Sequence, residues 1–292
     1  RGGIEVVMES KAMVQLMTKA EKIAQSETTV LIYGDTGVGK EVIARWIHKS
    51  SKRANGPYVA LNCSAIPEQL AESELFGHEK GAFTGAERRS VGLFEQADGG
   101  VLFLDEIGEM DLKLQAKVLR AIEERKIRRV GGTESLPVDI RLLAATHRDL
   151  SELVKKGKFR EDLYFRLDVA QLRVPTLRER KEDLRGIAEQ LILRHSKNLG
   201  IQIRSIDPSF WERLKSLEFP GNVRELSNLI ERSLIHFSGD SLTANQILLD
   251  GAGSGSAAKP RLNAPLSDLM AKFEKSILEQ ALVESEQDVD QA

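Results

Sequence analysis

The chain has 292 residues, of which 29% are charged and 41% hydrophobic, a balance typical of a globular protein able to bury a large core. Its formal net charge of -2 excludes a protein that coats nucleic acid through overall basicity. A single cysteine, Cys63, excludes an internal disulfide, and we expect it to be a small core residue in a reducing compartment. No stretch approaches the roughly 18 apolar residues of a membrane span, so we expect a cytoplasmic protein. The chain starts without Met, and we expect a fragment of a longer one.

Short apolar runs alternate with helical patterns in the first part of the chain. This alternation predicts an α/β fold in which helices flank a parallel sheet. The runs cover residues 30–33, 59–61, 101–104, 140–145 and 169–174.

From residue 180 the pattern becomes purely helical. Apolar residues recur at spacings of three and four, which predicts two helices with one buried stripe each. The first stripe is Leu184, Ile187, Ala188, Leu191, Ile192, His195 and Leu199, and the second is Val223, Leu226, Ile230, Leu234 and Phe237. We expect an α/β subdomain over residues 1–174, an all-α subdomain over 175–250, a Gly/Ser/Pro-rich linker over 251–265 and one further helix within 266–292.

A phosphate-binding loop is predicted between the first apolar run and the helical pattern of residues 41–49. Glycines let backbone N–H groups close around phosphate oxygens at a helix N-terminus, and the lysine reaches the β and γ groups. The loop consists of Gly34, Asp35, Thr36, Gly37, Val38, Gly39 and Lys40. Glu41 follows, where the general pattern has Ser or Thr, which shifts magnesium binding to Asp105 and water.

Asp105 and Glu106 end the apolar run 101–104, and ligands of such sheets collect at the carboxyl ends of the strands. We expect Asp105 to hold Mg²⁺, directly or through water, and Glu106 to polarise the water that attacks the γ-phosphate of ATP. The alternative, a solvated acidic pair, is disfavoured beside a phosphate loop.

Arg160 and Arg166 are six residues apart, a spacing that does not place them on one helical face. A phosphoryl-transfer site can take an arginine from a neighbouring subunit. Spacing alone does not assign that role to either residue.

Residues 81–86 read Gly81, Ala82, Phe83, Thr84, Gly85 and Ala86. Two glycines and small residues around one aromatic predict a loop. Phe83 either points outward, where a partner would bury it, or packs into the core, and composition leaves both possibilities open.

Together these residues resemble the central AAA+ ATPase domain of bacterial enhancer-binding proteins, the activators of sigma-54 RNA polymerase. The resemblance covers about residues 4–250, and its most specific part is residues 72–80 running into the GAFTGA loop, residues 81–86. It implies an AAA+ P-loop NTPase fold with a C-terminal helical lid. The implied function is hydrolysis of ATP, with Mg²⁺, by a hexameric or heptameric ring that remodels the closed sigma-54 holoenzyme.

Residue by residue, the resemblance implies that loop residues 81–86, Phe83 and Thr84 above all, contact sigma-54. Asn62 would hold Glu106 in an unproductive pose until that contact forms. Thr146 matches the family's first sensor, and the next residue is His147 where many relatives have Asn. Arg224, in the segment 221–226, matches the second sensor. Arg160 and Arg166 match the trans-acting arginine fingers, residues 128–137 correspond to a second pore loop, and Met8 stands where relatives commonly have Gly.

Residues 266–292 resemble the start of a Fis-type helix-turn-helix domain that would bind enhancer DNA, and a packing or dimerising helix is an equal alternative. Two other functions stay open on the residues alone. One is another AAA+ motor acting on nucleic acid or polypeptide, and the other is a nucleotide switch without turnover. Loss of Glu106 or of the arginines would favour the switch, and all are present.

Overall fold

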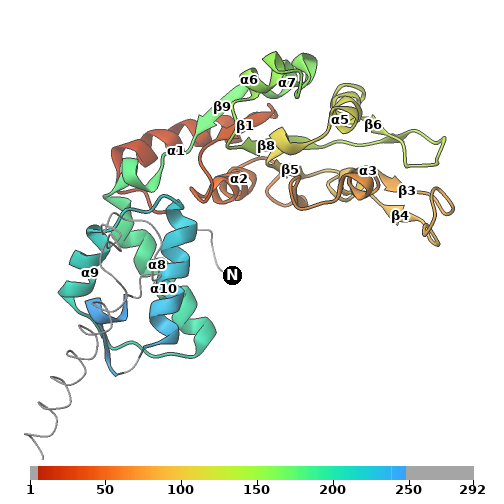
Figure 1. The fold of residues 1–292 in the computed structure, drawn as a ribbon. Coiled ribbons are helices and arrows are strands. Elements are labelled where there is room, and N and C mark those ends of the chain that lie inside the picture. Colours follow the sequence, from red (N-terminus) through yellow and green to blue (C-terminus); the bar gives the residue numbers. More distant parts are fainter. Residues whose placement is uncertain (1–5, 238, 248–292) are drawn as a thin grey trace, which may run out of the picture. The chain divides into compact units, whose positions relative to one another are not determined.

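The computed structural model describes residues 6–237 and 239–247. A five-stranded parallel sheet with the order β2-β5-β8-β1-β9 forms its first part (Figure 1). The strands are β1 (Val30–Tyr33), β2 (Tyr58–Asn62), β5 (Val101–Asp105), β8 (Arg141–Thr146) and β9 (Ala170–Arg173). Each lies on one of the five predicted apolar runs, so the predicted α/β fold with a parallel sheet is confirmed.

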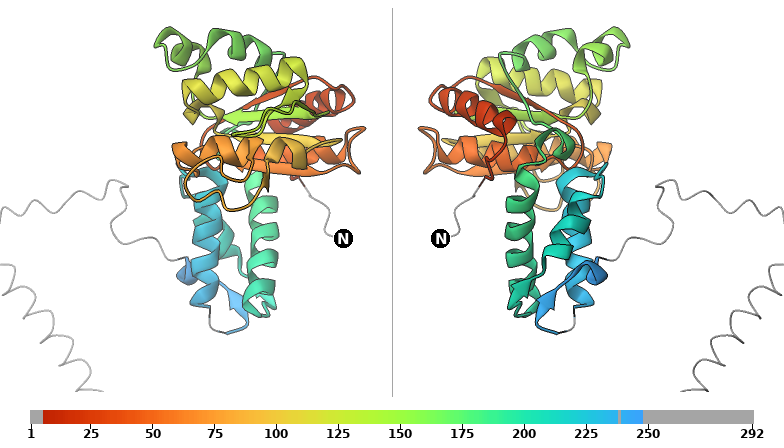
Figure 2. Two further views of the ribbon diagram at one scale, coloured as in Figure 1. Left: turned by 90° about the vertical axis from the view of Figure 1, so that its right-hand side faces the viewer. Right: turned by 90° about the vertical axis from the view of Figure 1, so that its left-hand side faces the viewer.

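Helices cover both faces of the sheet, which explains why its strands read as continuous apolar runs. Side chains alternate across each strand: Ile32 and Phe103 pack with α1 (Lys11–Ala24) and α2 (Lys40–Lys49). Leu31 and Leu104 pack on the other face with α3 (Glu68–Phe76), α5 (Leu112–Glu124), α6 (Leu150–Lys155) and α7 (Glu161–Leu167). Figure 2 shows these helices on either side of the sheet.

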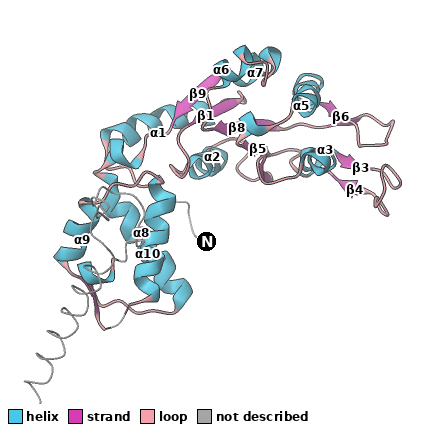
Figure 3. Cartoon of the chain, in the orientation of Figure 1, coloured by secondary structure: helices cyan, strands magenta, loops and turns pink. Residues whose placement is uncertain are grey.

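Two short antiparallel strand pairs carry the surface loops. They are β3 (Gly77–His78) with β4 (Ser90–Val91), and β6 (Lys126–Ile127) with β7 (Leu136–Pro137). The remaining short elements of this part are α4 (Leu93–Gln96) and η1 (Ile107–Glu109). Figure 3 shows the two strand pairs side by side.

A helical subdomain follows β9, as predicted. It contains η2 (Leu177–Arg180), α8 (Asp183–Leu199), β10 (Ser205–Ile206), α9 (Pro208–Lys215), α10 (Asn222–Ile235), β11 (Ser241–Leu242) and η3 (Ala244–Gln246). The predicted stripes form its core, with two corrections. Leu199 is exposed, because it is the last residue of α8 before the left-handed Gly200. Phe237 lies beyond the end of α10 but still packs against this core.

In the part of the chain that the structure describes, helices are too short or too polar to cross a membrane. The predicted linker over residues 251–265 and helix within 266–292 lie outside the described residues.

Candidate nucleotide site

The predicted site residues gather at one edge of the sheet because their strands are parallel and in register. Tyr33 of β1 pairs with Thr146 of β8, and Asn62 of β2 pairs with Asp105 of β5. β8 lies between β1 and β5. The phosphate loop, Asn62, the Asp105–Glu106 pair and Thr146 therefore all leave the sheet at its carboxyl edge, where ligands of such sheets bind.

The phosphate loop uses backbone conformations that favour glycine. Gly37 and Gly39 have φ values of 80° and 101°, in the left-handed region that L side chains rarely adopt. A Cβ atom on Gly39 would meet open space, so nothing in the described chain fills the volume beside it. The N–H of Gly34 donates to the carbonyl of Thr146 at 3.3 Å, which ties the start of the loop to β8.

Lys40 is the first residue of α2 and is 6% exposed. Its Nζ donates to the carbonyl of Gly34 at 2.9 Å and to that of Asp35 at 3.4 Å, and lies 3.2 Å from Oε1 of Glu106. A buried ammonium at a helix N-terminus suits the phosphate groups of a nucleotide, since helix amides and the lysine both attract negative charge. Glu41 instead points to Arg45 on the surface of α2.

Glu106 is held in a left-handed conformation with φ of 52°, which costs free energy for a non-glycine residue and is common at functional sites. Its Oε2 accepts from Nδ1 of His147 at 2.6 Å and from the His147 N–H at 3.3 Å. Burial by itself raises the pKa of Glu106, but the bonds from His147 and the charge of Lys40 outweigh it, and the pKa lies below its usual value. The surroundings of Glu106 therefore favour its carboxylate form.

Asp105 accepts a hydrogen bond from the N–H of Glu106 at 3.0 Å. Its pKa is raised by burial and by the neighbouring Glu106, against the charge of Lys40. Mg²⁺ at nucleotide sites commonly takes one or two carboxylates, with phosphate and water completing its octahedron. Asp105 fits that role, because it is a single half-buried carboxylate beside the phosphate loop.

The side chain of Asn62 does not reach Glu106 within the described chain. Its Oδ1 accepts from the N–H of Ser64 at 2.9 Å and from the hydroxyl of Ser64 at 2.7 Å. Lys40 and His147 occupy the two oxygens of Glu106 instead. The pose expected for Asn62 is thus absent from this structure, and its role as a switch stays a prediction.

The two predicted sensors come from different parts of the fold, Thr146 from β8 and Arg224 from α10. Thr146 is fully buried, and its hydroxyl accepts from the N–H of Arg148 at 3.0 Å. Arg224 is exposed in the first turn of α10, and its Cβ lies 3.0 Å from the position that a Cβ on Gly37 would take. The helical subdomain therefore brings Arg224 against the phosphate loop.

Arg160 and Arg166 are not brought into this site. Arg160 is the residue that precedes the first turn of α7, and its guanidinium pairs with Asp162 at 2.6 Å. Arg166 is exposed near the end of the same helix. Among the described residues, neither arginine bonds to Lys40, Asp105 or Glu106.

The predicted loop of residues 81–86 is a loop in the structure, closed by a 2.8 Å hydrogen bond from the N–H of Gly81 to the carbonyl of Ala86. Phe83 is 40% exposed, and its ring lies against the His78 ring in a T-shaped arrangement, with 5.0 Å between the ring centroids. This confirms the outward alternative for Phe83. Thr84 is exposed as well.

The loop is fastened to the second loop, residues 128–135, at its base. The N–H of Glu79 donates to the carbonyl of Val130 at 3.0 Å, and the Val130 N–H to the carbonyl of Gly77 at 2.9 Å. Arg129 is 5% exposed and bonds to both Glu79 and Glu95. Arg129 was not predicted from the sequence, where it lies between Arg128 and the apolar Val130.

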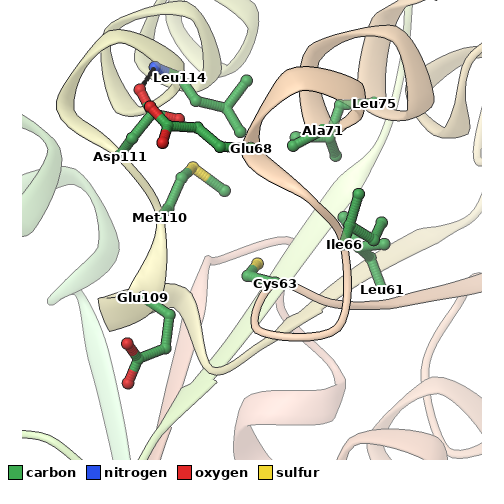
Figure 4. Close-up of a pocket in the computed structure, with 10 residues that line it drawn as sticks. All are labelled: Leu61, Cys63, Ile66, Glu68, Ala71, Leu75, Glu109, Met110, Asp111 and Leu114. Atoms are coloured by element: carbon green, nitrogen blue, oxygen red, sulfur yellow. Dashed lines mark hydrogen bonds between the residues drawn. The ribbon is translucent and has the colours of Figure 1, made fainter.

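A separate cavity of about 110 Å³ lies between the β2–α3 connection and the start of α5, and Cys63 lines it with Ile66 and Met110 (Figure 4). It contains none of the predicted nucleotide-site residues. Burial raises the pKa of the Cys63 thiol to about 12, which disfavours the reactive thiolate. The partly buried Cys63 packs against the main core, consistent with the predicted small core residue.

The chain matches known protein families and individual curated proteins. A family model described as the sigma-54 interaction domain matches residues 6–173, and one described as the AAA+ ATPase lid domain matches residues 178–261. The transcriptional regulatory protein FlbD of Caulobacter vibrioides is 51% identical over 81% of this chain and 52% of its own length. The regulatory protein AtoC of Escherichia coli is 51% identical over 80% of this chain and 51% of its own length. The chain thus spans about half the length of these two curated relatives.

Among solved structures, NtrX from Brucella abortus in complex with ATP is similar, with a TM-score of 0.78 and 35% identity. The match covers 93% of this chain and 61% of that one.

Proposed function

The chain belongs to the sigma-54 interaction domain family, and we propose that it is an ATPase that remodels sigma-54 RNA polymerase through residues 81–86. The observation that carries the proposal is the 3.2 Å approach of Lys40 to Glu106 at the carboxyl edge of the sheet. The solved ATP complex of the similar NtrX supports a nucleotide at this edge. Residues 1–174 would be the ATPase subdomain and residues 175–250 its lid.

In this proposal, phosphate oxygens bind at the N-terminus of α2. The ammonium of Lys40 then leaves Glu106 and binds the phosphate instead. Glu106 is then free to accept a proton from the attacking water. Asp105 would hold Mg²⁺ directly or through water, and the ion would neutralise charge on the β- and γ-phosphates. Thr146 and Arg224 would report the γ-phosphate from the sheet and from the lid.

Arg160 and Arg166 would serve the site of a neighbouring subunit. Arg160, just before α7, and Arg166, within α7, are both exposed, and this exposure supports the assignment. An arginine finger contributes about 10³ to 10⁵ in rate, so hydrolysis would require a ring, hexameric or heptameric.

The exposed Phe83 and Thr84 would deliver the output of the ATP cycle to sigma-54. Residues 81–86 contain no basic side chain, which speaks against a grip on nucleic acid. A partner protein that buries Phe83 accounts for an exposed aromatic side chain on a fastened loop. Such an activator would work in the cytoplasm and bind enhancer DNA through a region C-terminal to the lid.

The proposal is tested with Thr84→Ala. We expect this variant to hydrolyse ATP at the parent rate, because Thr84 lies outside the nucleotide site, yet to lose binding to purified sigma-54. Binding is measured by native gel shift with an ADP-metallofluoride complex present.

Thr18→Ala is the matched control, since Thr18 is exposed on α1 and its hydroxyl donates, within the described residues, to the carbonyl of Val14 in its own helix. The control should bind sigma-54 like the parent. Retained sigma-54 binding by Thr84→Ala would contradict the proposed role of the loop. Absence of ATP hydrolysis in the parent would contradict the proposed ATPase activity.

A further inference from the structure

Three successive carbonyls of the phosphate loop accept hydrogen bonds from the segment that follows β9. Nδ2 of Asn222 donates to Thr36 at 3.1 Å, the N–H of Val223 to Gly37 at 3.0 Å, and Nη2 of Arg180 to Val38 at 2.6 Å. The donors come from η2 and from the first turn of α10. None of these three bonds was expected from the sequence.

Asn222 is the centre of this arrangement. It is 2% exposed, and both ends of its carboxamide are used, because Oδ1 accepts from the N–H of Leu177 at 2.8 Å while Nδ2 reaches Thr36. Its φ of 55° lies in the left-handed region, which asparagine tolerates better than most side chains. One residue thus joins the phosphate loop, η2 and the start of α10.

Arg180 supports the same contact from η2. It is 4% exposed, and its Nη1 donates to the sulfur of Met13 in α1 at 3.3 Å. Burial lowers the pKa of this guanidinium, against the attraction of nearby Asp183. A buried cation usually has a carboxylate bonded to it. The buried guanidinium of Arg180 instead donates to the carbonyl of Val38, which therefore helps to stabilise its charge.

Holding these carbonyls has a direct effect on the amides that would bind phosphate. In a planar trans peptide unit, the C=O of one residue and the N–H of the next point in opposite directions. Bonds at the carbonyls of Thr36 and Val38 therefore fix the directions of the N–H groups of Gly37 and Gly39. A loop whose amides are already oriented binds an anion without first losing conformational freedom.

The same bonds place the second sensor. Arg224 follows Asn222 by two residues in the first turn of α10, and a Cβ on Gly37 would lie 2.3 Å from the carbonyl of Gly221. Such an approach leaves no room for displacement of α10 toward the loop.

We propose that Asn222 is a positioning residue that orients the phosphate loop and Arg224 before nucleotide binds, so that the loop and the start of α10 move as one body. The inference rests on the proposed nucleotide site. It adds that the helical subdomain shapes that site through the loop backbone, in addition to any contact of Arg224 with phosphate.

Two substitutions at Asn222 separate the side-chain bonds from the backbone conformation. Asn222→Gly keeps the left-handed φ at no steric cost and removes both side-chain bonds. Asn222→Asp keeps the size and the acceptor for Leu177 but sets an oxygen against the carbonyl of Thr36. Asn198→Asp on the exposed surface of α8 is the matched control.

Binding of a fluorescent ADP analogue is measured without turnover, together with amide hydrogen exchange of the nucleotide-free protein. We expect both Asn222 variants to bind the analogue about tenfold more weakly, the scale of one lost hydrogen bond, with faster exchange at the Val223 amide. The control should match the parent in both measurements.

The outcomes separate this inference from the proposed function. A parent chain that does not bind the ADP analogue contradicts the nucleotide site itself. If the parent binds and a folded Asn222→Asp protein binds equally well, Asn222 has only a structural role and the inference is wrong. A lower melting temperature with unchanged affinity likewise contradicts the inference, and Asn222→Asp decides alone if Asn222→Gly does not fold.

Discussion

At the scale of single residues, Glu106, the proposed general base, is held through both its backbone and its side chain. Glu106 has a left-handed backbone and is bonded on one oxygen by Lys40 and on the other by His147. A carboxylate only accepts hydrogen bonds, so Nδ1 of His147 must carry a proton. If phosphate displaces Glu106 from Lys40, as proposed, His147 would be the side chain in the described chain that still holds Glu106.

We expect His147→Ala to lower kcat for ATP hydrolysis about tenfold, a part of the 10²-fold or more that a general base contributes. KM should change less than twofold, because His147 contacts Glu106 and not the phosphate loop. Steady-state kinetics at saturating protein concentration measure both constants.

Arg148→Ala is the control for His147→Ala, since Arg148 is the next residue but pairs with Glu109 at 2.6 Å. A raised KM with unchanged kcat in His147→Ala would show that His147 assists binding and does not orient Glu106.

At the scale of elements, hydrogen bonds and packing join the two surface loops. Their bases share the hydrogen bonds of Glu79 and Val130, and Gly131 packs directly on Ala82, where an added Cβ would lie 2.7 Å from the Ala82 Cβ. Movement of the second loop would therefore move residues 81–86.

Gly131→Ala tests this coupling. The residue has φ of 74°, so the substitution costs roughly 1–2 kcal/mol of backbone strain and also pushes against Ala82. We expect faster hydrogen exchange at the amides of Glu79 and Val130.

Gly157→Ala supplies a matched control, because Gly157 has φ of 66° but an added Cβ would meet nothing within 4 Å. It should lose similar stability in urea without affecting the amides of Glu79 and Val130. Equal exchange in the two variants would argue against coupling of the loops.

At the scale of the whole molecule, the site has no arginine from α7 of its own chain among the described residues. Arg160 is paired with Asp162, and Arg166 is exposed. A site completed by a second copy of the chain, as proposed, would account for the exposure of Arg166.

Arg166→Ala should lower kcat by about 10³ or more if it acts as a finger, and parent activity per subunit should rise with protein concentration. A mixing experiment then asks whether the finger acts between subunits. Arg166→Ala and Glu106→Gln are each expected to be inactive. In an equal mixture, a site is complete when a subunit with an intact Glu106 has a neighbour with an intact Arg166. Random assembly meets both conditions in about a quarter of the sites, so the mixture should regain about a quarter of the parent activity. A mixture as inactive as its components would place Arg166 in its own subunit's site or outside catalysis.

Much of the fold was predictable because it depends on local pattern. Apolar runs for β1, β5 and β8 reflect a sheet buried on both faces, and the stripe of α8 reflects its 3.6-residue period. The prediction from this period was wrong at Leu199, which is exposed. Leu199 is the last residue of α8, where the helix no longer packs against the core. Residues 34–40 and Asp105–Glu106 could likewise be predicted as site residues. A phosphate loop needs glycines and a lysine close together in the chain, and the acidic pair directly follows an apolar strand.

Sequence by itself thus determined the parallel sheet, the phosphate loop, the acidic pair and the loop at residues 81–86. Only the tertiary structure decided that Phe83 points outward and which groups meet. The side chain of His147 meets Glu106, that of Arg129 meets Glu79 and Glu95, and that of Asn222 meets the backbone carbonyl of Thr36. These contacts join residues from 34 to 186 positions apart in the chain. They arise from strand order and from the return of α10 to the phosphate loop, which no local spacing encodes.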